Sequence, residues 1–144
     1  MSTMNPLSIV EQKVPCHLRS SFLPKKIPHL FLVFETLVYH YAGAFSKDYR
    51  SGDWNYYELS NGGFYMSLQS DDDFHVVIRN YCDGYLSANA LSIVATLCAL
   101  FELANEHEQV YLFRSYQQLR EYICSHPEAS EILRAFDFRG ANHG

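Results

Sequence analysis

The stretch WNYYELSNGGFYMSL, residues 54–68, decides the fold of this chain. Residues 54–59 are rich in aromatic side chains, which are enriched in β-strands. Asn61-Gly62 is the strongest short-range signal for a β-hairpin, because both central positions of its turn need a positive φ. Apolar and polar side chains then alternate over residues 64–69, which predicts the returning strand. The stretch therefore predicts an antiparallel hairpin.

Two further strands are predicted downstream of the hairpin. Residues 71–73 are three consecutive aspartates, which predict a turn. Residues 74–79 alternate between apolar and polar side chains, and a short fourth strand is expected at about residues 81–86. The four segments together predict an antiparallel meander.

Helices are predicted before and after the strands in the sequence. From Pro28, which fits a first helical turn, apolar residues recur at spacings of three and four up to Phe45. Residues 19–28 contain two prolines and are expected to be irregular. Ser87 is a good N-cap for a nearly all-apolar helix over residues 88–105. The thin polar stripe of this helix consists of Asn89, Ser92 and Thr96.

Two helices complete the predicted fold. Apolar residues at helical spacing predict a helix over residues 112–123, and Pro127 fits the first position of a last helix. The fold class is therefore α+β: an antiparallel meander of about four strands packed with about four helices in a single domain. We expect a flexible N-terminal arm at residues 1–15, the domain at 16–137 and a frayed tail at 138–144.

Composition excludes several classes of protein. The 144 residues are 48% hydrophobic and 19% charged, which excludes an intrinsically disordered chain. The net charge of -5 argues against a general nucleic-acid binder. Residues 51–113 carry nine acidic groups and one basic group, which favours a basic partner surface; an ordinary solvated acidic rim is the alternative. The apolar stretch at 90–101 is shorter than the roughly 20 residues that cross a bilayer, so we expect no membrane span. The first fifteen residues contain no long apolar stretch of a signal peptide, so we expect reduced cysteines and a cytoplasmic protein.

The sequence contains no recognisable catalytic or metal-binding motif. The four cysteines form no CxxC pair, the seven histidines have no metal-helix spacing, and HExxH, GxSxG and the P-loop are absent. Cys16-His17 would place a thiol beside a base, but adjacent residues rarely face each other. We therefore expect no enzyme activity, no metal and no cofactor.

The hairpin stretch also resembles a known family. Residues 54–66 are similar to the signature of the ArdB/KlcA antirestriction proteins. Residues 22–25, 86–97 and 116–129 resemble other segments of that family, so that the resemblance covers about residues 16–137. It implies a small α/β protein of bacterial plasmids and other mobile elements. Its implied role is to relieve restriction of incoming unmodified DNA by type I restriction–modification systems.

The resemblance implies no catalytic centre and no established binding site. The implied partner is a type I restriction–modification enzyme or an associated host protein, without tight DNA binding. Polar or aromatic positions that match the family are the candidate functional residues, namely Arg19, Glu35, Trp54, Tyr57, Asn61 and Asp137.

Structural roles compete with functional ones at three of these candidates. Glu35 is a carboxylate in the middle of an apolar helix, so it needs a partner, for which Arg19 is one possibility, or a position at the helix edge. Trp54 is either a core aromatic or an interface residue. For Asn61, its role in the hairpin turn is the stronger explanation.

Imitation of DNA is disfavoured by the charge of the chain. A globule of this size spans roughly 37 Å, and duplex DNA of that length carries on the order of 20 negative charges. The net charge is only -5. Three hypotheses remain: a restriction inhibitor that acts through protein contacts or indirectly, which we favour, a DNA-binding accessory protein of a mobile element, and a small unrecognised enzyme.

Overall fold

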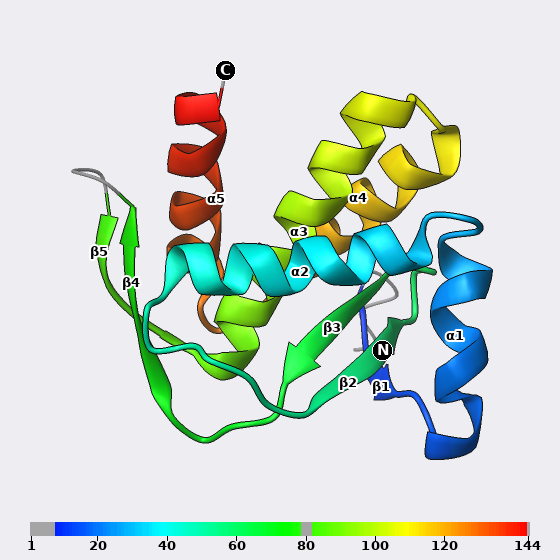
Figure 1. Ribbon diagram of the computed structural model, residues 1–144, viewed down its shortest axis with the longest axis horizontal. Helices are drawn as coiled ribbons and strands as arrows, with labels where there is room; N and C mark the ends of the chain where they lie inside the picture. The colour runs from blue at the N-terminus through cyan, green and yellow to red at the C-terminus, as the bar shows by residue number, and fades with distance from the viewer. Residues whose placement is uncertain (1–7, 79–81, 144) are drawn as a thin grey trace, which may run out of the picture.

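Two small antiparallel sheets and five α-helices make up the part of the chain that the computed structural model describes, residues 8–78 and 82–143 (Figure 1). The strands are β1 (Glu11–Lys13), β2 (Trp54–Leu59), β3 (Phe64–Leu68), β4 (Asp73–Ile78) and β5 (Cys82–Ser87). The helices are α1 (Arg19–Lys26), α2 (Phe31–Phe45), α3 (Ala88–His107), α4 (Val110–Ile123) and α5 (Ala129–His143), with a short 3₁₀ helix, Cys16–Leu18, before α1. The predicted α+β class with a single domain is confirmed.

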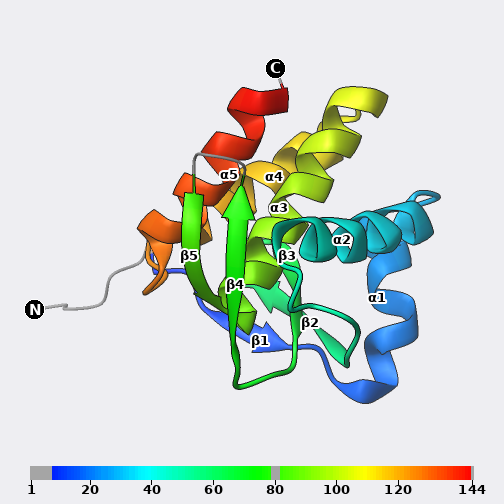
Figure 2. The same ribbon diagram turned by 60° about the vertical axis from the view of Figure 1, so that its left-hand side comes forward.

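The strands are divided between two sheets. The hairpin strands β2 and β3 form a three-stranded sheet with β1, in the order β1-β2-β3. Strands β4 and β5 form a two-stranded sheet of their own, and Figure 2 shows this sheet beside the three-stranded one. Helix α3 contacts both sheets. Residues 79–81, where the predicted third and fourth strands meet, lie outside the described residues.

The polar stripe of α3 explains why β4 does not continue the first sheet. The even-numbered residues of β3 point their backbone groups away from β2, because the ladder bonds join odd-numbered residues such as Gln69 and Asp53. On that outer edge the Leu68 N–H donates to Ser92 Oγ at 2.8 Å, and the Met66 N–H lies 3.3 Å from Thr96 Oγ1. These α3 side chains therefore occupy the edge at which another strand would pair.

Helix α3 is the core helix that the sequence predicts. Ser87 Oγ accepts a hydrogen bond from the Ala90 N–H at 3.1 Å, so the predicted N-cap is confirmed. By length and composition alone α3 could cross a membrane, but 78% of its most apolar window is buried inside the protein. Its apolar surface is thus covered by the other helices and the sheets.

The chain before α2 is more regular than the sequence predicts. Residues 11–13, inside the predicted flexible arm, form β1, and the Val14 N–H extends the pairing by donating to Tyr56 O at 2.8 Å. A strand of three residues is too short to show a periodic pattern, so no such pattern predicts it. The predicted irregular segment forms α1 around Pro24, because burial of Phe22 outweighs the one helical hydrogen bond that proline cannot make.

Two helices begin later than their prolines predict. Pro28 precedes α2, and His29 after it has a φ of 68° before the helix begins at Phe31. Helix α5 begins at Ala129 rather than at Pro127: the Ile132 N–H donates to the Glu128 carbonyl at 2.9 Å, and the Glu128 carboxylate accepts hydrogen bonds from Ser87 N (3.0 Å) and Oγ (2.5 Å). The helix continues to His143, past the predicted boundary at residue 137.

We expect Ser92→Ala to destabilise the protein by about 1–3 kcal/mol, because the buried Leu68 N–H would lose its acceptor. Urea denaturation measures this change. Ser20→Ala, at an exposed position of α1, is the matched control and should change the free energy of unfolding by less than about 0.5 kcal/mol. Equal effects of the two substitutions would contradict the role given to Ser92.

Candidate functional site

Four of the six candidate residues fall into two groups on opposite faces of the three-stranded sheet. Side chains alternate between the faces along β2, so Trp54 and Tyr56 lie on one face and Tyr57 on the other. We call the first group the Tyr56 cluster; it consists of Arg19, Glu35, Tyr39, Trp54 and Tyr56. We call the second group the Tyr65 cluster; it consists of Glu11, Tyr57, Tyr65, Asn89, Tyr122 and His126.

Arg19 completes the edge of β2 where β1 ends. Its guanidinium donates to the Trp54 carbonyl oxygen at 2.6 Å and to Asn55 Oδ1 at 3.0 Å. The Trp54 carbonyl faces the side on which β1 pairs, so the side chain takes the place of the next strand residue. The guanidinium carbon also lies 5.5 Å from the centre of the Tyr56 ring, a cation–π distance.

The hydrogen-bond partner of Glu35 is Tyr56, and not Arg19, the partner that the sequence suggests. The Tyr56 hydroxyl donates to Glu35 Oε2 at 2.7 Å, from β2 to the middle of α2. Burial, followed by this hydrogen bond and the negative charge of Glu35, raises the pKa of Tyr56. Burial and Glu35 also raise the pKa of Tyr39 to about 12. Both phenols therefore stay protonated at neutral pH and can donate to the carboxylate.

Trp54 lies in the core, which favours its structural role. The residue is 6% exposed, and its ring lies 5.4 Å from that of Tyr39 and 5.9 Å from that of Tyr49, centre to centre. Its indole Nε1 is buried and has no hydrogen-bond partner among the described residues. An unpaired buried donor is unfavourable, so packing against the two tyrosines must outweigh it.

Three stacked tyrosines define the Tyr65 cluster. The Tyr57 and Tyr65 rings are 5.2 Å apart and nearly parallel, and Tyr122 of α4 lies 5.9 Å beyond Tyr65. The Glu11 carboxylate accepts hydrogen bonds from the hydroxyls of both Tyr65 and Tyr122. Burial first, and then Glu11, raise the pKa of both phenols. Glu11 thereby fastens β1 to α4.

Asn89 and His126 extend this cluster to the start of α5. Asn89 Nδ2 donates to the Tyr65 hydroxyl at 3.0 Å, and Asn89 Oδ1 lies 2.8 Å from His126 Nε2. His126 Nδ1 accepts from the Glu128 N–H at 2.9 Å, so the proton of a neutral imidazole belongs on Nε2. Burial lowers the pKa of His126, against the opposing effect of Glu128 and Glu11.

Asn61 and Asp137 lie outside both clusters. Asn61 Oδ1 accepts from the Gly63 N–H at 2.9 Å, and its amide donates to the Gln118 carbonyl at 2.9 Å, which docks the hairpin on α4. Only Gly62 has a positive φ in this turn, 96°, so the expectation of a positive φ at Asn61 is wrong. Asp137 is exposed on α5, and the described residues bring none of the other candidates to it.

Hydrogen bonds and stacked aromatic rings join the side chains of the two clusters. Among residues 8–78 and 82–143, no group of three or more His, Cys, Asp or Glu side chains is placed to hold a metal ion. The cysteine of the Cys16-His17 pair is exposed on the short 3₁₀ helix. The sequence analysis does not single out Glu11, Tyr65 or Tyr122. The excess of tyrosine, 11 residues, is the available signal for Tyr65 and Tyr122.

Comparisons with known proteins agree on one family. A family model described as "Antirestriction protein" matches residues 47–137. The chain is 37% identical over 140 residues to an Escherichia coli protein named "Antirestriction protein KlcA", covering 92% of this chain and 96% of that one. A second Escherichia coli protein of the same name is 38% identical over 125 residues, covering 83% and 88%.

A solved structure has the same fold. It is described as "The structure of the KlcA and ArdB proteins show a novel fold and antirestriction activity against Type I DNA restriction systems in vivo but not in vitro". The TM-score is 0.82 at 36% sequence identity, and the match covers 94% of this chain and 99% of that chain.

We expect Trp54→Ala to lower the free energy of unfolding by about 3–5 kcal/mol, because it removes a buried aromatic ring between two tyrosines. Trp54→Phe, which also removes the unpaired N–H, should lose less than half of that. Glu35→Gln keeps an acceptor for Tyr56 and should stay within about 1 kcal/mol of the parent. A Trp54→Ala variant as stable as the parent in urea would refute the core position of Trp54.

We expect stability to fall as the pH is lowered from about 7 to about 5.5, because the unfolded chain then binds a proton at His126 more readily than the folded chain does. His126→Gln removes the titrating group and can keep both hydrogen bonds, so it should reduce this slope. His17→Gln, at an exposed position, is the control and should leave it unchanged. Urea midpoints across this pH range measure the slope; identical slopes in all three proteins would rule out the assignment.

Proposed function

The chain belongs to the antirestriction protein family, and on this premise we propose that it relieves restriction of incoming unmodified DNA by type I restriction–modification systems. The observation that carries the proposal is the match of nearly the whole chain, in sequence and in fold, to proteins described as antirestriction proteins. A match that covers nearly the whole of both proteins supports a shared role.

We further propose that relief proceeds through protein contacts or another cellular component, and not through imitation of DNA. The net charge of the chain supports this proposal. It is only -5, whereas a DNA duplex of similar length carries on the order of 20 negative charges. The activity that the similar structure is described as having in vivo but not in vitro also supports a component that the purified system lacks.

The proposed role needs no chemical step by this chain. In both clusters tyrosine hydroxyls donate to carboxylates of other elements, which holds those elements in fixed positions. The proposed place of action is the cytoplasm of a bacterium, and the proposed origin is a plasmid or another mobile element. The partner is a type I enzyme or a host protein associated with it.

The test is the plating of unmodified phage on cells with a type I system, with and without this protein. We expect the protein to raise plating of unmodified phage while modification of the progeny persists, because the proposal concerns restriction alone. Modified phage is the control and should plate equally well in both strains. Unchanged plating in several type I systems, with soluble protein demonstrated, would reject the proposal.

A further inference from the structure

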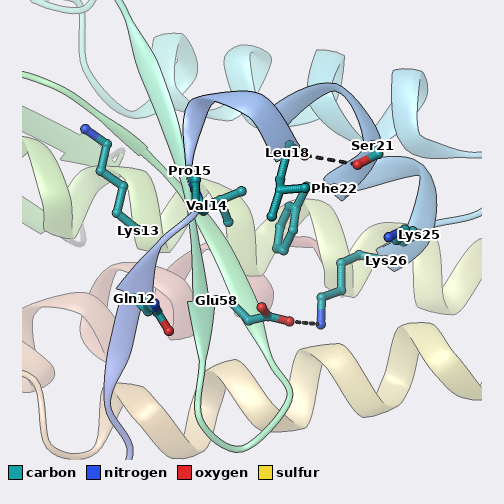
Figure 3. A pocket seen from close by; sticks show the side chains of 10 residues that line it. All are labelled: Gln12, Lys13, Val14, Pro15, Leu18, Ser21, Phe22, Lys25, Lys26 and Glu58. Atoms are coloured by element: carbon teal, nitrogen blue, oxygen red, sulfur yellow. Dashed lines mark hydrogen bonds and ion pairs between the residues drawn. The ribbon is translucent and has the colours of Figure 1, made fainter.

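A groove of about 460 Å³ lies between β1 and α1 (Figure 3). The strand and the loop that follows it form one wall, α1 forms the other, and Glu58 of β2 contributes a carboxylate between them. Leu18, which is 44% exposed, and the ring of Phe22 give the groove an apolar part. The groove is therefore shaped by backbone on one side and by a helix surface on the other.

Lysines surround this groove in a chain that is acidic overall. Lys26 crosses it to Glu58, with Nζ and Oε2 2.9 Å apart, while Lys25 beside it has no ion pair with a described residue. Lys13 also lines the groove, and Figure 3 shows its side chain directed away from α1. Positive charge thus lies on both faces of β1, with Lys25 and Lys26 on one and Lys13 on the other.

The outer edge of β1 is open to a further strand. In the antiparallel register with β2, Val10 and Val14 bond to Ser60 and Tyr56, so the backbone groups of Glu11 and Lys13 face away from β2. No described residue pairs with them. Such an edge is a template for an added strand, a common mode of peptide recognition.

Charge complementarity selects the occupant of this edge. Lysine on an edge strand discourages pairing with apolar or basic strands. A strand with acidic side chains on both faces would instead meet Lys13 on one side and Lys25 on the other. Duplex DNA is a poorer occupant, because a flat edge with three lysines neutralises few phosphates while the chain carries a net -5.

We propose that the outer edge of β1 and the adjoining groove bind an extended acidic segment of a partner protein, which adds to the sheet as a strand. This inference rests on the proposed function, since that partner would be the cellular component through which restriction is relieved. The lysines supply attraction and orientation, and the Glu11 and Lys13 backbone groups supply the ladder.

The direct test is a titration of the full chain with a fluorescein-labelled peptide that repeats Glu-Glu-Val-Val over about nine residues, so that a strand of it presents Glu on both faces. We expect saturable binding, and binding at least about tenfold weaker for the Lys13→Glu/Lys25→Glu variant. The matched control is Lys47→Glu/Arg114→Glu, which makes the same charge change at exposed positions elsewhere and should stay within about twofold of the parent. Lys25→Glu alone serves if the double variant does not fold.

Three outcomes of the titration would overturn the inference. These are absence of saturable binding, equal weakening in both double variants, and equal binding of a peptide with Lys in place of Glu. A duplex DNA probe that binds more tightly than the peptide, and loses affinity in Lys13→Glu/Lys25→Glu alone, would reassign the groove to nucleic acid. Amide resonances of Glu11 and Lys13 should shift on binding the peptide; shifts confined to β4 and β5 would overturn the proposed place of binding.

Phage plating separates this inference from the proposed function. If the parent relieves restriction and Lys13→Glu/Lys25→Glu does not, while Lys47→Glu/Arg114→Glu still does, the groove is the route to the partner. If both double variants relieve restriction fully, the groove is not that route and the inference fails alone. If the parent gives no relief, the proposed function fails, and the peptide titration still decides whether the groove binds an acidic segment.

Discussion

The hydrogen bonds from the backbone of β3 to Ser92 and Thr96 of α3 are the constraint on which the other features of the fold depend. They close one edge of the three-stranded sheet with side chains of a buried helix. Strand β4 therefore pairs with β5 in a separate sheet, and α3 becomes the element that contacts both. The opposite edge, at β1, has no such cover among the described residues, so the sheet has one closed and one open edge.

This asymmetry explains which parts of the fold could be predicted from sequence. The bounds of β2 and the N-cap of α3 follow from local patterns, and both agree with the structure. The separation of the sheets does not, because the pattern of β4 is the same whichever strand it pairs with. Strand β1 and helix α1 are not predicted, for a similar reason. They form because residues far along the chain pair with β1 and bury the apolar side chains of α1.

The candidate site shows the same division between local and distant causes. The hairpin role of Asn61 was foreseen, whereas its hydrogen bond to Gln118 joins residues far apart in sequence. For Glu35 the sequence predicts either a partner, such as Arg19, or a position at the helix edge; in the structure its partner is Tyr56. Arg19 instead completes the edge of β2. Contacts of this kind leave no periodic trace, so only the structure identifies them.

The clusters and the open edge together describe a protein that presents fixed surfaces. Tyrosines in both clusters are held as hydrogen-bond donors to carboxylates, which fixes α2 and α4 against the three-stranded sheet. The free backbone of β1 then lies at a defined position beside lysines on a rigid helix. This arrangement suits recognition of a protein segment, in agreement with the proposed action through another cellular component.

Hydrogen exchange at two backbone amides tests the account of one closed and one open edge most directly. The Leu68 amide, bound to buried Ser92, should exchange only through global unfolding, with a free energy equal to that from urea denaturation. The Lys13 amide, on the outer edge of β1, should exchange far faster in the free protein. Equal exchange rates at the two amides would contradict the account.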